Sequence, residues 1–312
     1  MALPLPFGVP VHPFAERHVR DLVGRVDPEV VHFHMGAVTP SVQASLEAAA
    51  GRARVLEVHS VWTPGVVRAY RTLDRLITFP PQGVQLASVS ETAAGPVRAA
   101  FGRDVEVVPN GVDLDFWKVE PVDHRGVHVV SALRFATRKR PEALLEILAQ
   151  ASRELVPDGG LTATLAGDGP GLERVREWVR SEGLDDRISL PGRLPREDLR
   201  ELYRRSDIYL NPAILEAFPV SVLEARAAGL VVLARSQAGS AEQFEHGVNG
   251  IAADTDEELA AALVRLVREP DELTRLRQGC EENPPRFDWP RVVQRNAEVY
   301  EMARRMARSG GR

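Results

Sequence analysis

Short apolar runs rich in β-branched residues alternate along the chain with longer stretches in which apolar residues recur at helical spacing. The apolar positions in each short run are continuous rather than alternating, as expected for strands of a parallel sheet that helices cover on both faces. The runs predicted as strands are Glu29–His34, Val55–His59, Leu86–Ser90, Val105–Pro109, Val127–Leu133, Leu161–Ala166, Ile188–Leu190, Ile208–Asn211 and Val231–Ala234. The pattern therefore predicts an α/β fold.

A charged, aperiodic segment at Lys118–Arg125 interrupts the alternation of strands and helices. Because 312 residues exceed what one core usually organises, two Rossmann-like domains are expected, one over residues 1–118 and one over residues 119–288. The helical pattern of residues 289–307 is expected to pack back on the first domain.

The first domain offers only four predicted strands and opens on a proline-rich coil and a helix-like stretch, Pro13–Arg25. A doubly wound sheet usually begins with a strand and a glycine-rich turn that binds phosphate. Since no such pair precedes Val30, we expect this domain to be incomplete.

Composition narrows the class of partner. A formal charge of −5 and a pI near 6.0 give no basic footprint for nucleic acid. Cys280 is the single cysteine, the first residues lack the features of a signal peptide, and no apolar run approaches about 20 residues. These features predict a cytoplasmic protein whose contact with a membrane, if any, is peripheral.

Two carboxylates, Glu216 and Glu224, flank a predicted loop-to-helix junction. Ser221 or a neighbour can open the helix, which would place Glu224 in its first turn and Glu216 in the preceding loop. A carboxylate accepts two hydrogen bonds at once and so suits the vicinal hydroxyls of a sugar or ribose. The alternative is that Glu216 is a solvated acid and Glu224 a favourable charge near a helix start.

Arg134 and Lys139 follow a predicted strand and precede the helix predicted over Glu142–Leu155, with Pro141 suited to its first position. Positive side chains and the amides of a helix start together favour binding of a diphosphate without a metal. The alternative is a basic surface turn.

Further loops follow the ends of other predicted strands. Gly167 and Gly169 would allow backbone to approach a flat ligand closely, and Arg193 with its neighbours could reach a nucleobase. The segment Ala238–Glu242 should lie at the same carboxyl-end edge of the sheet as Glu216.

His32, His34 and His59 lie at strand ends, and the first two share one face by the two-residue period. A zinc site of three histidines would require a further ligand. Hydrogen-bonded histidines are therefore the favoured interpretation, and no metal is expected.

From about Glu29 onward the chain resembles the retaining GT-B glycosyltransferases of family 4 (glycosyl transferases group 1), without counterparts of that family's first strands. The segments that carry the resemblance are Val30–His34, Val58–His59, Val89–Ser90, Val107–Asp113, Arg134 with Lys139, Gly167–Pro170, Asp207–Pro212, Glu216 with Glu224, and Gly239 with Glu242. The resemblance implies two Rossmann-like domains that face a cleft.

It also implies roles for single residues. Glu224 would bind the ribose hydroxyls of a nucleotide-sugar donor, and Glu216 would bind the donor sugar. Arg134 and Lys139 would bind the diphosphate, and His59 would lie near the sugar and phosphate. The family's chemistry implies retention through front-face attack, with no enzymatic nucleophile and no cofactor.

One departure concerns the donor loop, where Pro219 replaces the glycine that usually follows Phe218. Proline removes one backbone donor, but the amides of Phe218, Val220 and Ser221 remain available to the donor.

The sequence thus predicts transfer of a sugar from a nucleotide-diphosphate sugar to an acceptor that is a small molecule, a lipid or a polysaccharide. The alternative is a noncatalytic nucleotide-sugar-binding or partner subunit, and a nucleotide-sugar isomerase fits less well. A homodimer or a partner chain could pair with the exposed sheet edge. Arg68, Arg71 and Arg75 lie near one helical face, for which a solvated surface is favoured over an interfacial helix.

Overall fold

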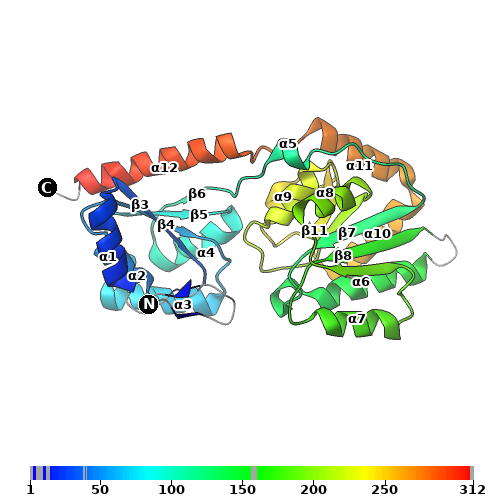
Figure 1. The fold of residues 1–312 in the computed structure, drawn as a ribbon, viewed down its shortest axis with the longest axis horizontal. Helices are drawn as coiled ribbons and strands as arrows, with labels where there is room; N and C mark the ends of the chain where they lie inside the picture. Colours follow the sequence, from blue (N-terminus) through cyan, green and yellow to red (C-terminus); the bar gives the residue numbers. More distant parts are fainter. Residues whose placement is uncertain are drawn as a thin grey trace. The chain divides into compact units, whose positions relative to one another are not determined.

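The computed structural model describes residues 3–4, 10–11, 15–37, 39, 41–155 and 160–309, which form two compact units (Figure 1). The first unit runs to Pro109 and resumes at Pro290, and the second is Asn110–Trp289. The division thus precedes the predicted boundary at residue 118. The segment after Pro109 belongs to the second unit because the amide of Val112 donates to the carbonyl of Phe287 at 2.8 Å.

The first unit contains a four-stranded parallel sheet in the order β3-β4-β5-β6, which confirms the four predicted strands. The strands are β3 (Val30–Met35), β4 (Ala53–Val58), β5 (Val84–Ser88) and β6 (Val105–Val107). A separate antiparallel pair joins β1 (Leu3–Pro4) to β2 (Pro10–Val11).

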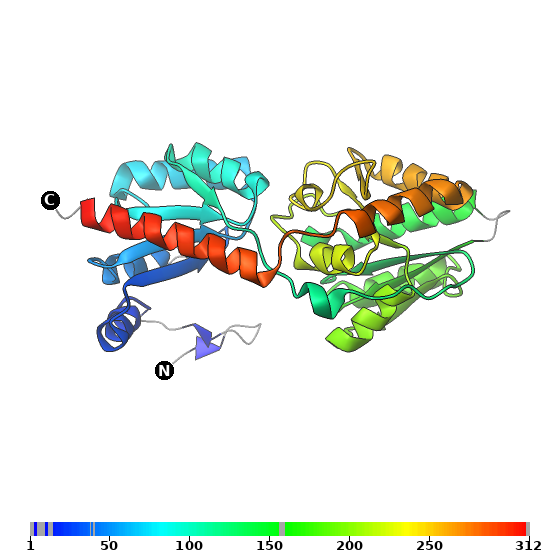
Figure 2. The same ribbon diagram turned by 90° about the horizontal axis from the view of Figure 1, so that it is seen from above.

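Helices cover both faces of this sheet, as continuous apolar strands require. They are α1 (Ala15–Val26), α2 (Val42–Ala48), α3 (Pro64–Ile77), α4 (Glu91–Phe101) and α12 (Trp289–Ser309). Leu46, Val97 and Phe101 from α2 and α4 share one buried cluster with strand residues. Val299 and Ala303 of α12 belong to a second buried cluster with strand residues. Figure 2 shows this helix, in red, lying along the sheet. The helix predicted over residues 289–307 thus packs on the first unit.

The second unit contains a six-stranded parallel sheet in the order β12-β11-β10-β7-β8-β9. The strands are β7 (Val127–Ala132), β8 (Leu161–Ala166), β9 (Ile188–Gly192), β10 (Ile208–Asn211), β11 (Val231–Arg235) and β12 (Gly250–Ala253). The sequence pattern predicted all but β12. That strand, Gly-Ile-Ala-Ala, has a single β-branched residue, and its pairing with β11 decides its conformation.

The second unit has helices on both sides of its sheet and an extensive apolar core. They are α5 (Leu114–Trp117), η1 (Thr137–Lys139), α6 (Pro141–Glu154), α7 (Leu172–Ser181), α8 (Arg196–Arg204), α9 (Val220–Ala227), η2 (Ala241–Gln243), α10 (Asp256–Arg268) and α11 (Pro270–Glu282). Because all strands are parallel, the loops after β7, β8, β10 and β11 leave the same edge of the sheet.

None of the helices within the described ranges is both long enough and apolar enough to cross a membrane.

Candidate functional site

An ion pair joins two of the predicted site residues in the second unit. Lys139 ends the short helix η1 after β7, and Glu216 lies in the loop after β10. The ammonium of Lys139 donates to Oε1 of Glu216. Glu216 is buried, with 5% of its surface exposed, whereas Lys139 is partly exposed. The structure thus brings together a cation and an anion that are remote in sequence.

The pair lines a small pocket at the carboxyl ends of β7 and β10. Tyr209 of β10 also lines it, and its hydroxyl donates to the carbonyl of Ala132 at 3.0 Å and lies 2.8 Å from Oγ of Ser221. Polar groups from two strand ends and one helix start therefore converge on one small volume.

The helix behind this pocket begins one residue before Ser221. Helix α9 starts at Val220, with Pro219 as its N-cap residue, and Ser221 is its second residue. A neighbour of Ser221 therefore opens the helix, as the prediction allowed, and the serine hydroxyl bonds to Tyr209 instead. Glu224 consequently lies beyond the first turn, which contains no acidic residue.

Glu224 has an unusual proton affinity. Burial raises its pKa to about 7, and the positive charge of Arg196 opposes this shift only in part. The carboxyl group therefore changes charge near neutral pH, which neither prediction about this residue anticipated.

Two contacts fix the loop that carries Glu216. The amide of Gly239 donates to the carbonyl of Glu216 at 2.8 Å, and a Cβ at Gly239 would lie only 1.7 Å from the carbonyl oxygen of Ala217. On another part of the loop, Nδ2 of Asn110 donates to the carbonyl of Phe218 at 3.0 Å. Gly239 therefore acts by allowing close backbone contact, and the loop is held before any ligand binds.

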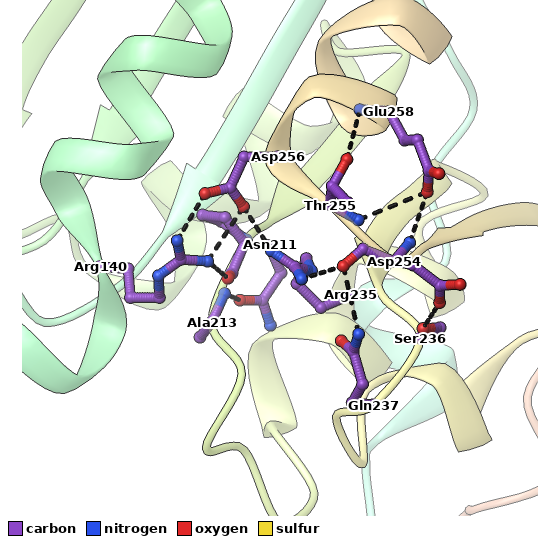
Figure 3. Close-up of polar contacts among 11 residues, drawn as sticks. Arg140, Asn211, Ala213, Arg235, Ser236, Gln237, Asp254, Thr255, Asp256 and Glu258 are labelled. Atoms are coloured by element: carbon purple, nitrogen blue, oxygen red, sulfur yellow. Dashed lines mark hydrogen bonds and ion pairs between the residues drawn. The ribbon is translucent and has the colours of Figure 1, made fainter.

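A charged network supports the base of the same loop (Figure 3). Nη1 of Arg140 donates to the carbonyl of Pro212 at 2.8 Å and to Oδ1 of Asp256 at 3.0 Å. Arg235, itself buried, donates to the same oxygen at 2.7 Å. Burial alone would raise the pKa of Asp256, but hydrogen bonds from both guanidinium groups lower it. Sequence reasoning missed this network because its members come from three separate segments.

The glycine-rich turn after β8 packs against another loop. Gly167 and Gly169 have φ values of 138° and 141°, and a Cβ at either would collide with the carbonyl oxygen of Leu133 or Phe135, at 1.8 and 2.6 Å respectively. The close approach predicted for these glycines is thus to the loop that carries Arg134.

Other predicted residues are more exposed. Arg134 and Arg193 are exposed on loops after β7 and β9, and Val220 is 40% exposed at the start of α9. Phe218 is buried against the ring of Phe287, with 5.2 Å between centroids.

His59 belongs to the first unit, where it follows β4 and contacts a histidine and a carboxylate. Its Nε2 lies 2.7 Å from Nδ1 of His34 and 3.4 Å from Oε2 of Glu57. Glu57 is also 3.2 Å from His32. Burial raises the pKa of Glu57, but hydrogen bonds from the three imidazoles outweigh it and hold this pKa well below its usual range. Sequence reasoning overlooked Glu57, which the two-residue period of β4 places on the face of His59.

Family models match nearly the whole chain. The model described as Glycosyl transferases group 1 matches residues 117–283, and the model described as Glycosyltransferase Family 4 matches residues 2–116.

Two curated relatives match long stretches of the chain. D-inositol 3-phosphate glycosyltransferase of Thermobispora bispora is 30% identical over 63% of this chain and 50% of its own length. The GPI3 subunit of phosphatidylinositol N-acetylglucosaminyltransferase from Saccharomyces cerevisiae is 24% identical over 90% of this chain and 65% of its own length. The chain thus spans about half to two thirds of these relatives.

A solved structure resembles the whole fold. The Anabaena protein Alr3699/HepE, solved in complex with UDP, aligns with a TM-score of 0.72 at 21% identity, covering 92% of this chain and 81% of that one. This likeness establishes the GT-B fold.

Proposed function

Because the chain belongs to the glycosyl transferases group 1 family, we propose that it transfers a sugar from a nucleotide-diphosphate sugar to an acceptor. The observation that carries the proposal is the pairing of Lys139 with buried Glu216 in a pocket at the carboxyl ends of β7 and β10. Such strand ends are where ligands bind in parallel α/β sheets.

In this proposal the two members of the ion pair bind different parts of the donor. The ammonium of Lys139, partly exposed, neutralises charge that develops on the departing diphosphate. The carboxylate of Glu216 keeps its second oxygen for the hydroxyl groups of the donor sugar. Arg134, exposed on the loop before η1, adds a second positive charge for the diphosphate.

Helix α9 provides the remaining donor contacts in this proposal. Glu224 accepts hydrogen bonds from the ribose hydroxyls in its ionised form. Amides at the start of the helix, those of Val220 and Ser221, lack partners within the helix and can donate to the donor. The turns at Gly167, Gly169 and Arg193 lie at neighbouring strand ends and provide contacts for the nucleobase.

We propose that transfer proceeds with retention and without an enzymatic nucleophile. Glu216 would be a poor nucleophile because Lys139 already binds its carboxylate. The departing phosphate instead accepts the proton of the acceptor hydroxyl as that hydroxyl attacks. No metal is needed in this proposal because Lys139 and Arg134 stabilise the leaving group.

The names of both relatives contain inositol, which makes inositol-containing acceptors the first class to test. We also propose a cytoplasmic location, which the single cysteine, Cys280, favours.

A thermal-shift panel of UDP-, GDP- and ADP-sugars tests donor binding. A ligand at 100 times its dissociation constant adds about 2.7 kcal/mol of stability, which gives a measurable shift. The donor that binds is then incubated with inositol, inositol phosphate and phosphatidylinositol, and products are followed by NMR. No shift with any donor contradicts the proposal. Binding without hydrolysis or transfer would favour the noncatalytic nucleotide-sugar-binding subunit instead.

A further inference from the structure

An open apolar pocket lies in the first unit, where helices α2 and α3 both contribute to its wall. Its volume is about 410 Å³, which is within the range of about 300–1,000 Å³ typical of small-molecule sites. Apart from Thr39 and Gln43, the described side chains that line it are apolar, and they include Val42, Val66, Ala69, Tyr70, Leu73 and Phe79. Such a lining favours the apolar part of a ligand, because binding removes apolar surface of both partners from water.

Helix α3 leaves its apolar face partly uncovered at this pocket. None of its residues, all of which the structure describes, is buried, and Val66, Tyr70 and Leu73 are only half-buried. The neighbouring helix α4, by contrast, buries Val97 and Phe101. Apolar residues at positions i, i+4 and i+7 of a surface helix normally pack against the core. The uncovered part of this face is therefore available to a ligand.

Stacked aromatic rings hold the wall of the pocket in place. The ring of Tyr70 stacks on that of Trp62, with 4.3 Å between centroids, and on that of Phe79, with 5.3 Å. Both partners of Tyr70 are buried. A hydrogen bond also joins the Tyr70 side chain to the backbone of Thr39, in the loop after β3. These contacts form the pocket before a ligand binds, which lowers the entropic cost of binding.

The apolar surface continues beyond the pocket along α3. Ile77 lies one turn after Leu73 on the same face of the helix, and 50% of its surface is exposed. From Val66 to Ile77 the helix rises about 16 Å, at about 1.5 Å per residue. An apolar surface of this length fits an extended alkyl chain better than a compact ring.

The pocket also adjoins the edge of the sheet where ligands bind. Ala37 and Thr39 follow β3, and α3 begins at Pro64, shortly after β4 ends at Val58. In parallel α/β sheets, ligands bind at this carboxyl-end edge. An alkyl chain that lies along α3 would therefore have its polar end near the start of the helix and its tail towards Ile77.

We propose that this pocket binds a fatty acyl chain of the acceptor, which makes the acceptor a lipid. The inference rests on the proposed function, in which the protein glycosylates an inositol-containing acceptor. Of the three acceptors proposed above, phosphatidylinositol is the one with acyl chains. Inositol and inositol phosphate present hydroxyl and phosphate groups, which would not cover the apolar lining. The pocket thus distinguishes a lipid acceptor from a water-soluble one.

The test compares two phosphatidylinositols that share a headgroup and differ in the length of their acyl chains. Isothermal titration without donor measures how the dibutanoyl and dihexanoyl forms bind to the full chain, at concentrations below those at which they form micelles. Each buried methylene group strengthens binding about fourfold, so the dihexanoyl form should bind at least about tenfold more tightly.

Two variants of the pocket should reduce this gain in affinity. Ala69→Trp places a large side chain in the pocket and should abolish the gain. Leu73→Asn keeps a similar volume, makes the lining polar and should also reduce the gain. The matched control is Ala99→Trp, because Ala99 is likewise an exposed helical alanine of this unit, but on α4 and away from the pocket. It should retain the full gain.

Circular dichroism verifies that the variants fold. Equal affinities of the wild type for the two forms, or an undiminished gain in both Ala69→Trp and Leu73→Asn, would overturn the inference. The thermal-shift panel separates this result from a failure of the proposed function. A shift with donor but no gain with chain length overturns the acyl-chain pocket alone, whereas a gain with chain length but no shift with any donor overturns the proposed function.

Discussion

The ammonium of Lys139 donates to the buried carboxylate of Glu216, although the two residues follow different strands of the sheet. Each strand end contributes one charge, and the contact neutralises both before a donor arrives. The pair is therefore part of the folded structure as well as of the candidate site.

Replacing Lys139 by alanine should destabilise the protein. The change leaves the Glu216 carboxylate buried without this donor, and an unsatisfied buried acceptor costs roughly 1–3 kcal/mol. Urea unfolding of Lys139→Ala measures the loss. The double variant Lys139→Ala with Glu216→Gln should recover part of it, because the amide carries no charge. Equal losses in the single and double variants would show that the ion pair is not the cause.

Donor binding should tighten as pH rises through neutrality. Glu224 has a pKa of about 7, so below that pH its carboxyl is mainly protonated and is a poorer acceptor of hydrogen bonds from the ribose hydroxyls. The dissociation constant of UDP should therefore fall between about pH 6 and about pH 8, as measured by isothermal titration. In Glu224→Gln this dependence should flatten.

The raised pKa of Glu224 also predicts that the stability of the fold decreases as pH rises. The folded-state pKa is raised above the ordinary value of 4.5 to about 7. Between these two pH values the folded state therefore binds more protons than the unfolded state. The stabilising contribution is fully present below pH 4.5 and is lost as pH rises through about 7. The difference in free energy of unfolding between wild type and Glu224→Gln should follow this course. A difference that is constant with pH would contradict it.

A methyl group at Gly239 should disrupt the donor loop. The added Cβ would lie 1.7 Å from the carbonyl oxygen of Ala217, so the loop that carries Glu216 must move. Gly239→Ala should lower the thermal midpoint and abolish the shift produced by the donor. Gly95→Ala is the control, since a Cβ there meets nothing within 4 Å and its helical position favours alanine by about 1 kcal/mol. A donor shift of wild-type size in Gly239→Ala would contradict the role of this contact.

Removing Arg140 should destabilise the base of the loop that carries Glu216. Its guanidinium bonds to the carbonyl of Pro212 and to Asp256, so Arg140→Ala should cost roughly 1–3 kcal/mol of stability. Arg138→Ala removes an exposed guanidinium from the preceding helix η1 and should have little effect. Similar urea midpoints for the two variants would refute the bracing role of Arg140.

Local patterns in the sequence predicted most of the strands, because continuous β-branched runs leave few alternatives in a parallel sheet. Strand β12 escaped notice since Gly250–Ala253 has little intrinsic strand preference, and its neighbour β11 determines its conformation. The prediction that Glu224 lies in the first turn of α9 was wrong, because the helix already begins at Val220.

Contacts between remote segments were harder to predict. The pairing of Lys139 with Glu216 and the Arg140–Asp256–Arg235 network depend on how strand ends align, which no local pattern encodes. Burial also determines the raised pKa of Glu224. The candidate residues were therefore predictable by type and position, whereas their electrostatic coupling required the fold.

Isothermal titration of the donor identified by thermal shift, with wild type and Lys139→Ala compared at one pH, measures whether Lys139 binds the diphosphate. The lost charge-assisted hydrogen bond to the diphosphate should weaken binding at least tenfold, since such bonds contribute about 1.5–3 kcal/mol. Equal donor affinities in the folded wild type and variant would contradict the proposal that this ion pair forms the donor site.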